Sequence, residues 1–327
     1  MTNHTKQQKT AAIIGTGVIG AGWAARYLAN GYLVKAWDPG KGAAEKLQQS
    51  ITNAWPSLQK IGLKENADIA NLHFCDSLAE ACADANIIQE SAPEVVEIKS
   101  KLLQEIGISA PTDAIIGSST SGFKPSGLQK EVNKPERVIV THPFNPVYLL
   151  PLVEVVGGEL TSADTIERAK AIYTAIGMHP LHVRKEIDGH LSDRLLEALW
   201  RENLHLVNDG IATTGELDEA IIYGPGLRWA LMGTNLTYHL AGGDDGMRHM
   251  LEQFGPALKL PWTKLEAPEL SDDLIDSMVE GTQQQAGERS VKELEQLRDN
   301  CLISIMEALS QYDVGAGKVL NDYRKAN

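Results

Sequence analysis

The chain has few cysteines and no long apolar run. Its three cysteines, Cys75, Cys82 and Cys301, are odd in number and lack the spacing of metal ligands, so we expect reduced thiols and no metal site. No segment approaches the roughly eighteen uncharged apolar residues of a membrane-spanning helix. Residues 1–10 are polar and lack the apolar segment of a secretory signal. These absences predict a cytoplasmic protein that does not contact a membrane.

Basic residues are scarce relative to acidic ones. The chain carries 30 Lys and Arg against 43 Asp and Glu, a formal net charge of −13 at pH 7. This charge repels the phosphates of nucleic acid, which is therefore not an expected partner, and it gives an anionic ligand no long-range attraction. With 327 residues, of which 43% are hydrophobic, the chain can build one large domain or two ordinary ones. We expect a globular protein with a small-molecule substrate.

A glycine-rich turn follows the first apolar run, and it reads Gly15-Thr16-Gly17-Val18-Ile19-Gly20. In such a turn the first glycine allows a tight bend, the second lets the backbone approach a pyrophosphate, and the third lets the helix pack on its strand. The helix N-terminus then offers N–H groups to the phosphates. A second apolar run ends at Asp38, where an acidic side chain binds a ribose 2′-hydroxyl and repels the extra phosphate of NADP. The pattern predicts NAD as the cofactor; a glycine-rich turn without a ligand is the alternative.

Apolar runs alternate with helical patterns in the first part of the chain. We expect strands at 11–14, 33–37, 72–75, 87–90, 114–118 and 138–141, two added edge strands at 152–156 and 181–183, and helices at 41–61, 77–82 and 163–176. Strands separated by helices predict an α/β fold with a doubly wound, mostly parallel sheet of the Rossmann type. This NAD-binding domain is expected to span residues 1–187.

Helical spacing replaces the strand pattern after residue 187. Thr213 with Glu216, and Ser290 with Glu293, have the spacing of capping boxes and are expected to begin helices. Residues 188–327 are therefore predicted to form an all-helical C-terminal domain that contributes to substrate binding.

Three polar residues suit the removal of a proton from an alcohol. His142 follows the strand 138–141, at the sheet edge where such folds bind ligands, and histidine titrates near neutrality. Glu154 lies in the apolar run 152–156 and needs a partner; bonded to an imidazole it would select the tautomer and favour the imidazolium. Ser121 follows the strand 114–118 and can hydrogen-bond the reacting oxygen. Each residue also has a structural alternative. His142 could be a strand-end histidine whose hydrogen bonds are satisfied within the protein, Glu154 a carboxylate turned to solvent, and Ser121 a helix cap.

Two motifs in order carry a family resemblance. Thr141-His142-Pro143-Phe144-Asn145-Pro146, followed by Leu152-Val153-Glu154-Val155-Val156, resembles the signature of the 3-hydroxyacyl-CoA dehydrogenase family. The resemblance implies that His142 and Glu154 form a catalytic dyad, that Ser121 contacts the substrate oxygen, and that Asn145 lies at the substrate. It also implies a position near the nicotinamide for Glu90, whose alternative is a strand-end charge. A homodimer built through the helical domain is implied as well.

The chain departs from the family pattern at one position. Family members read G-F-[IV]-x-N-R-L at the start of the helical domain, whereas this chain reads Gly189-His190-Leu191-Ser192-Asp193-Arg194-Leu195. Asp193 therefore replaces an amide with a carboxylate. A carboxylate that faces the substrate would suit a positively charged one, although an Asp in the first turn of a helix is also favourable through the helix dipole alone.

Two further segments, at 224–233 and 254–265, resemble the branch of the family that acts on carnitine. Carnitine is a 3-hydroxy acid with a carboxylate at one end and a trimethylammonium at the other. Arg228 is the candidate for the carboxylate, because a guanidinium presents two parallel donors; a surface ion pair is the alternative. Among Trp200, Trp229 and Trp262, we expect Trp229 to face the ammonium, since aromatic faces attract such cations, although core packing is the commoner role.

Three other functions stay open at this stage. The same chemistry could act on L-gulonate or on a short 3-hydroxyacyl-CoA. The chain could also be a non-catalytic dinucleotide-binding protein of the crystallin kind.

Overall fold

The computed structural model describes residues 8–230, 232–265, 271–274, 276, 279 and 286–326. It divides into two compact units, one comprising Met1–Asp193 with Val319–Asn327 and the other Arg194–Lys318. Residues 319–327, which lie in the predicted span 188–327 of the helical domain, group with the first unit in this division. The remaining predicted boundary, between residues 187 and 188, stays a prediction.

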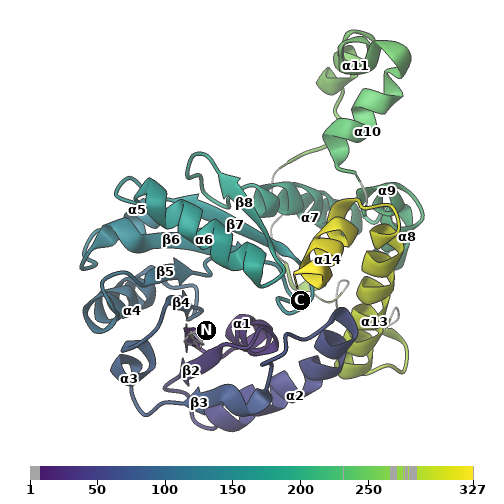
Figure 1. Cartoon of the computed structure of the whole chain (residues 1–327). Coiled ribbons are helices and arrows are strands. Elements are labelled where there is room, and N and C mark those ends of the chain that lie inside the picture. Colours follow the sequence, from purple (N-terminus) through teal and green to yellow (C-terminus); the bar gives the residue numbers. More distant parts are fainter. Residues whose placement is uncertain are drawn as a thin grey trace. The chain divides into compact units, whose positions relative to one another are not determined.

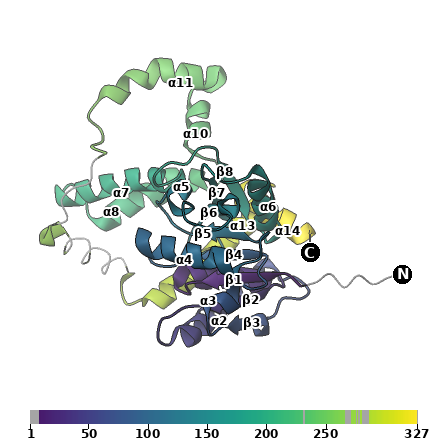
Figure 2. The ribbon, with the colours of Figure 1, turned by 90° about the vertical axis from the view of Figure 1, so that its left-hand side faces the viewer.

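The first unit is built on a sheet of eight strands in the order β3-β2-β1-β4-β5-β6-β7-β8 (Figure 1). In Figure 2 the strand labels follow one another in this order from β3 to β8. The pairs from β3 to β6 are parallel, β7 is antiparallel to β6, and β8 is parallel to β7. The prediction of a doubly wound, mostly parallel sheet is confirmed. The strands are β1 Thr10–Ile14, β2 Leu33–Trp37, β3 Leu72–Phe74, β4 Ile87–Glu90, β5 Ile115–Ser118, β6 Val138–Pro143, β7 Leu152–Gly157 and β8 His179–Val183.

Helices cover both faces of this sheet because its strands are apolar on both sides. In β1, Ala11 and Ile13 join one core and Ala12 and Ile14 join the other, as expected for side chains that alternate along a strand. The first core is closed by helices α1 Val18–Ala29, α2 Ala43–Ile61 and α6 Ala163–Ala175. The second core is closed by α3 Leu78–Cys82, α4 Val96–Ser109 and α5 Pro125–Leu128.

A buried arginine on α1 fixes the connection that follows β6. Arg26 donates to the carbonyl oxygens of Val147 (2.8 Å), Leu150 (3.3 Å), Ile176 (3.1 Å) and Gly177 (3.1 Å). Burial lowers the pKa of Arg26 to about 10, which still leaves the side chain charged at pH 7. The four carbonyl acceptors engage four of its five N–H donors, and two of them tie the β6–β7 connection to the first helix.

The C-terminal helix α14 (Gly315–Lys325) explains why the end of the chain belongs to the first unit. Arg324 donates to the carbonyl oxygens of Ile61 (3.0 Å) and Lys60 (3.2 Å), and the Tyr323 hydroxyl donates to that of Gly62 (3.0 Å). These carbonyls lie at the C-terminal end of α2, where a helix leaves its acceptors unsatisfied and where positive charge is favourable.

The second unit is helical in the part of the chain that the structure describes. The capping boxes predicted at Thr213 and Ser290 are both present, with the side chains of Glu216 and Glu293 returning to the cap N–H groups. Its helices are α7 Ser192–Asn208, which starts at the end of the first unit, α8 Thr214–Ile222, α9 Pro225–Trp229, α10 Thr234–Ala241, α11 Gly246–Phe254 and α13 Val291–Ser310. Among the described residues, no helix is both long and apolar enough to cross a membrane.

Candidate active site

The glycine-rich turn joins β1 to α1 with the geometry that its three glycines permit. Gly15 has φ +89°, and a Cβ there would lie 2.7 Å from the Ser91 carbonyl oxygen. A Cβ at Gly20 would collide with the Gly15 carbonyl. A Cβ at Gly17, in contrast, would meet no described atom within 4 Å. The first and third glycines are thus required by the protein itself, whereas the space over Gly17 suits a ligand that approaches the backbone closely.

Asp38 closes the other side of this turn. Its Oδ2 accepts hydrogen bonds from the Thr16 backbone N–H (2.7 Å) and hydroxyl (3.2 Å), and its Oδ1 accepts one from Gly40 N–H (2.8 Å). Gly15, Gly17, Asp38 and Gly40 line a pocket of about 770 Å³. Val18 and Ile19 are the first two residues of α1, where the backbone N–H groups have no partner within the helix and can bind a ligand. The turn fits the pyrophosphate and ribose of a dinucleotide.

His142 and Glu154 are brought together by the antiparallel pairing of β6 and β7. The two residues occupy the same register position, so their side chains project side by side on one face of the sheet. His142 Nδ1 lies 3.0 Å from Glu154 Oε2, and both side chains are buried. The predicted pair therefore exists in the geometry that a carboxylate-oriented histidine requires.

The second oxygen of Glu154 is held by the backbone that leads into α7. Its Oε1 accepts hydrogen bonds from the N–H groups of Leu191 and Ser192, each at 3.0 Å. Burial by itself raises the pKa of Glu154, but the hydrogen bonds from His142 and from these two N–H groups outweigh it, and the pKa falls below its ordinary value. Glu154 is consequently a carboxylate at neutral pH.

Asp193 and His190 lie at the other side of the imidazole. Asp193 Oδ2 is 3.7 Å from His142 Nε2, and the ring of His190 is centred 5.7 Å from that of His142. His190 Nε2 is 3.4 Å from the Thr120 carbonyl oxygen, while its Nδ1 is buried with no hydrogen-bond partner among the described residues. Burial, helped by neighbouring His142, lowers the pKa of His190, which is therefore neutral at pH 7.

Ser121 and Asn145 lie on loops at the ends of β5 and β6. Both residues are exposed, and neither forms a hydrogen bond with the dyad among the described residues. Ser121 N–H donates instead to Glu94 Oε1 (3.1 Å). Their roles at the substrate stay predictions.

Glu90 is engaged entirely within the protein. It is fully buried; its Oε1 accepts from Lys99 Nζ (3.0 Å) and Ala92 N–H (2.7 Å), and its Oε2 accepts from the Ser118 hydroxyl. Both carboxylate oxygens of Glu90 are therefore occupied by donors of the protein, and its position near the nicotinamide stays a prediction.

Arg228 and Trp229 belong to the second unit, on the short helix α9. Both side chains are exposed there. Their proposed contacts with the substrate stay predictions, and Leu231 of the same predicted segment lies outside the described residues.

Sequence reasoning missed three site residues, Lys99, Glu94 and His190. Lys99 carried a usable signal, because it occupies a position on the buried stripe of α4 with Leu103 and Ile106. A lysine on an apolar helix face needs a buried acid as partner. His190 stands where the family pattern has phenylalanine, which was visible in the sequence. Glu94 gave no comparable signal.

The described residues include no group of three or more His, Cys, Asp or Glu placed to hold a metal ion. The side chains that the structure brings together around His142 are a second imidazole and two carboxylates.

Comparison with known proteins agrees with this geometry. Residues 10–187 match the NAD binding domain of 3-hydroxyacyl-CoA dehydrogenase, and residues 189–288 match the C-terminal domain of the same family. A protein named L-carnitine dehydrogenase from Pseudomonas putida is 58% identical over 314 residues, which are 96% of this chain and 98% of that protein. One of the same name from Oceanobacillus iheyensis is 58% identical and covers 93% of this chain and 99% of its own length.

A solved structure shares the fold over nearly the whole chain. It is 5-formyl-3-hydroxy-2-methylpyridine 4-carboxylic acid 5-dehydrogenase, described as an NAD+-dependent dismutase, with a TM-score of 0.77 and 25% identity, covering 93% of this chain and 99% of that one. With both family domains matched in order, the chain is an NAD-binding protein that belongs to the 3-hydroxyacyl-CoA dehydrogenase family.

Proposed function

We propose that the chain oxidises the 3-hydroxyl group of L-carnitine to give 3-dehydrocarnitine, with NAD+ as the hydride acceptor. The observation that carries the chemistry is the buried hydrogen bond between His142 and Glu154 at the carboxyl end of β6. The choice of carnitine is supported by relatives of that activity at 54–60% identity over more than nine-tenths of the chain.

The dyad is arranged to accept a proton at Nε2. Because Glu154 is a carboxylate, the hydrogen at the 3.0 Å contact belongs to His142 Nδ1, and the lone pair lies on Nε2. Nε2 takes the hydroxyl proton, and Glu154 stabilises the imidazolium that results. Ser121 holds the reacting oxygen by a hydrogen bond. NAD+, when bound, accepts the hydride released from C3.

The charged ends of carnitine need a cation site and an anion site. The ammonium nitrogen of carnitine is two bonds from the carbon that bears the hydroxyl, so it must lie close to the proton acceptor. Asp193 is the acidic side chain 3.7 Å from Nε2, and we assign it to the ammonium. Asn145, Arg228 and Trp229 are the proposed remaining contacts, with Arg228 on the carboxylate and Trp229 on the methyl groups.

A substrate panel tests this function. With NAD+, kcat/KM should be higher for L-carnitine than for L-gulonate or 3-hydroxybutyryl-CoA, and D-carnitine serves as the stereochemical control. Activity confined to the thioester or to gulonate would reject carnitine while keeping the dehydrogenase. Tight NADH binding without turnover of any hydroxy acid would favour a non-catalytic role.

We also propose that the protein is a cytoplasmic homodimer formed through the helical unit. That unit exposes large apolar side chains, which a second copy would cover; Leu195, Tyr223, Leu227 and Trp262 are each more than two-thirds exposed. Light scattering on the full chain should then give twice the 35.6 kDa of one copy. A mass of one copy at micromolar concentration would reject the dimer.

A further inference from the structure

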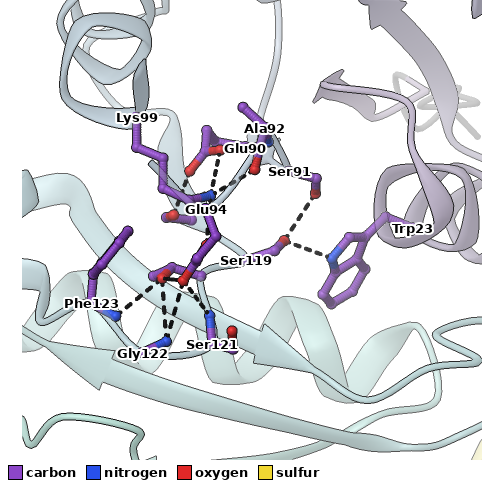
Figure 3. Close-up of polar contacts among 12 residues, drawn as sticks. Trp23, Glu90, Ser91, Ala92, Glu94, Lys99, Ser119, Ser121, Gly122 and Phe123 are labelled. Carbon is purple, nitrogen blue, oxygen red and sulfur yellow. Dashed lines mark hydrogen bonds and ion pairs between the residues drawn. The ribbon is translucent and has the colours of Figure 1, made fainter. Parts of the chain in front are cut away.

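Glu94 holds the loop that carries Ser121. Its Oε1 accepts hydrogen bonds from the backbone N–H groups of Ser121 (3.1 Å) and Gly122 (3.4 Å), and from the Thr120 hydroxyl. The Thr120 oxygen in turn accepts from Phe123 N–H (3.1 Å). Figure 3 shows Glu94 between Lys99 and the N–H groups of this loop. One carboxylate oxygen thus binds three consecutive residues of the loop that follows β5.

The other oxygen of Glu94 is anchored through a buried lysine. Lys99 Nζ lies 3.3 Å from Glu94 Oε2, 3.0 Å from Glu90 Oε1 and 3.0 Å from the Ala92 carbonyl oxygen. Lys99 and Glu90 are almost completely buried, so the ammonium cannot move without losing charged partners in a medium of low dielectric. Glu90 itself accepts from the Ser118 hydroxyl, on the strand that leads into the loop. The position of Glu94 is therefore fixed from the ends of two neighbouring strands.

Hydrogen bonds of Ser119, the residue before Thr120, restrain the same loop from its other side. Ser119 Oγ lies 3.0 Å from Ser91 Oγ and accepts a hydrogen bond from Trp23 Nε1 (3.1 Å) (Figure 3). Trp23 is fully buried in α1, the helix that follows the glycine-rich turn. Ser119 and Ser121 flank Thr120, so the loop is held on both sides of its buried residue.

The protein groups that contact the Glu94 carboxylate are donors, and the side chain is 42% exposed, so water also reaches it. Lys99 donates to one oxygen, and two N–H groups and a hydroxyl donate to the other. A glutamine in this place has one NH2 group. In one amide orientation that group would face the Lys99 ammonium, and in the other it would face the loop N–H groups, so donor would meet donor in both cases. The site therefore requires a carboxylate, and a neutral isostere of the same shape should release either the lysine or the loop.

We propose that Glu94 is a positioning residue for Ser121: it sets the Ser121 hydroxyl against the reacting oxygen through the Lys99-anchored network. The inference rests on the proposed function in that Ser121 binds the oxygen of a 3-hydroxy acid. Glu94 forms no hydrogen bond with the dyad, and its contacts with the protein are with the loop and Lys99.

A double-mutant cycle between Glu94→Gln and Ser121→Ala tests this role, using full-length enzyme and whichever 3-hydroxy acid of the panel the wild type oxidises. Glu94→Gln should lower kcat by about 5- to 50-fold in the wild-type background and by less than about 2-fold in Ser121→Ala, since the two residues act in one network. Thr120→Val, which removes one donor to Glu94, should show the same dependence on Ser121 with a smaller loss. It also provides the test if Glu94→Gln does not fold.

Glu97→Gln is the matched control. Glu97 is an exposed acid on the first turn of α4, three residues from Glu94, and its replacement should leave kcat unchanged. Equal losses from Glu94→Gln in both backgrounds would overturn the proposal, as would no loss in Glu94→Gln or in Ser121→Ala. Absence of carnitine turnover by the wild type would reject the substrate proposal alone, because the cycle can be run on another hydroxy acid.

Discussion

His142 and Glu154 occupy the same register position on the antiparallel strands β6 and β7, with Nδ1 and Oε2 3.0 Å apart. The pairing makes them cross-strand neighbours although twelve residues separate them in the chain. Burial of both side chains removes competing water, and the N–H groups of Leu191 and Ser192 occupy the remaining carboxylate oxygen. The pair is a preorganised proton acceptor.

Replacing His142 with Gln should lower kcat by about 10² or more, the usual cost of losing a general base. The Kd of NADH should be unchanged, since the glycine-rich turn does not depend on His142. Steady-state kinetics and NADH fluorescence titration measure the two quantities. His179→Gln, at an exposed histidine of β8, is the control and should keep full activity. A His142→Gln enzyme with wild-type kcat would remove His142 from its role.

Replacing Glu154 with Gln should lower kcat by about 10² to 10⁴, because the amide NH2 would donate to Nδ1 and place the imidazole hydrogen on Nε2. The same variant tests a pH effect on stability. The pKa of Glu154 is lowered on folding, so its stabilising contribution is complete above the unfolded value of about 4.3 and is lost as the pH falls through the folded value. The Tm of the wild type should exceed that of Glu154→Gln at pH 7.

That difference in Tm should shrink below about pH 4, where the carboxyl group becomes protonated. Glu159→Gln, at an exposed acid just after β7, should show no such pH-dependent gap. A gap that stays constant down to pH 3 would contradict a lowered pKa at Glu154.

Replacing Asp38 with Asn should weaken NAD+ use and improve relative use of NADP+. The carboxylate is proposed to bind the ribose hydroxyls, and a charge-assisted hydrogen bond of about 1.5–3 kcal/mol corresponds to about a 10- to 100-fold loss in kcat/KM for NAD+. The ratio of kcat/KM for NADP+ to that for NAD+ should rise, because the repulsion of the 2′-phosphate disappears. An unchanged ratio would show that Asp38 serves only to hold Thr16 and Gly40.

Replacing Asp193 with Asn, the residue of the family pattern, should reduce discrimination in favour of the cationic substrate. The measurement compares L-carnitine with its isostere 3-hydroxy-5,5-dimethylhexanoate, in which an uncharged carbon replaces the ammonium nitrogen and the carboxylate is kept. The ratio of their kcat/KM values should fall at least about 5-fold, because two opposite charges about 4 Å apart attract by about 1 kcal/mol in water and by more near a protein surface. Equal losses on both compounds would mean that Asp193 acts on His142, which lies 3.7 Å away, and not on the ammonium.

The sequence alone determined the strands of the first unit and the positions of motifs in both units, whereas helices α4 and α5 were not predicted. The strands, the glycine-rich turn and the capping boxes at Thr213 and Ser290 could be predicted because each depends on the spacing of a few neighbouring residues. His142 and Glu154 were found in the same way, from a strand end and from a charge in an apolar run.

Only the tertiary structure decided which side chains meet. The register of β6 and β7 pairs His142 with Glu154, and the meeting of β4, β5 and α4 turns Glu90 inward onto Lys99. The same packing places Glu94 under the serine loop and His190 beside the dyad. These contacts join residues from separate elements, and a side chain's partner is set by the packing of elements against each other, which no local pattern in the chain encodes.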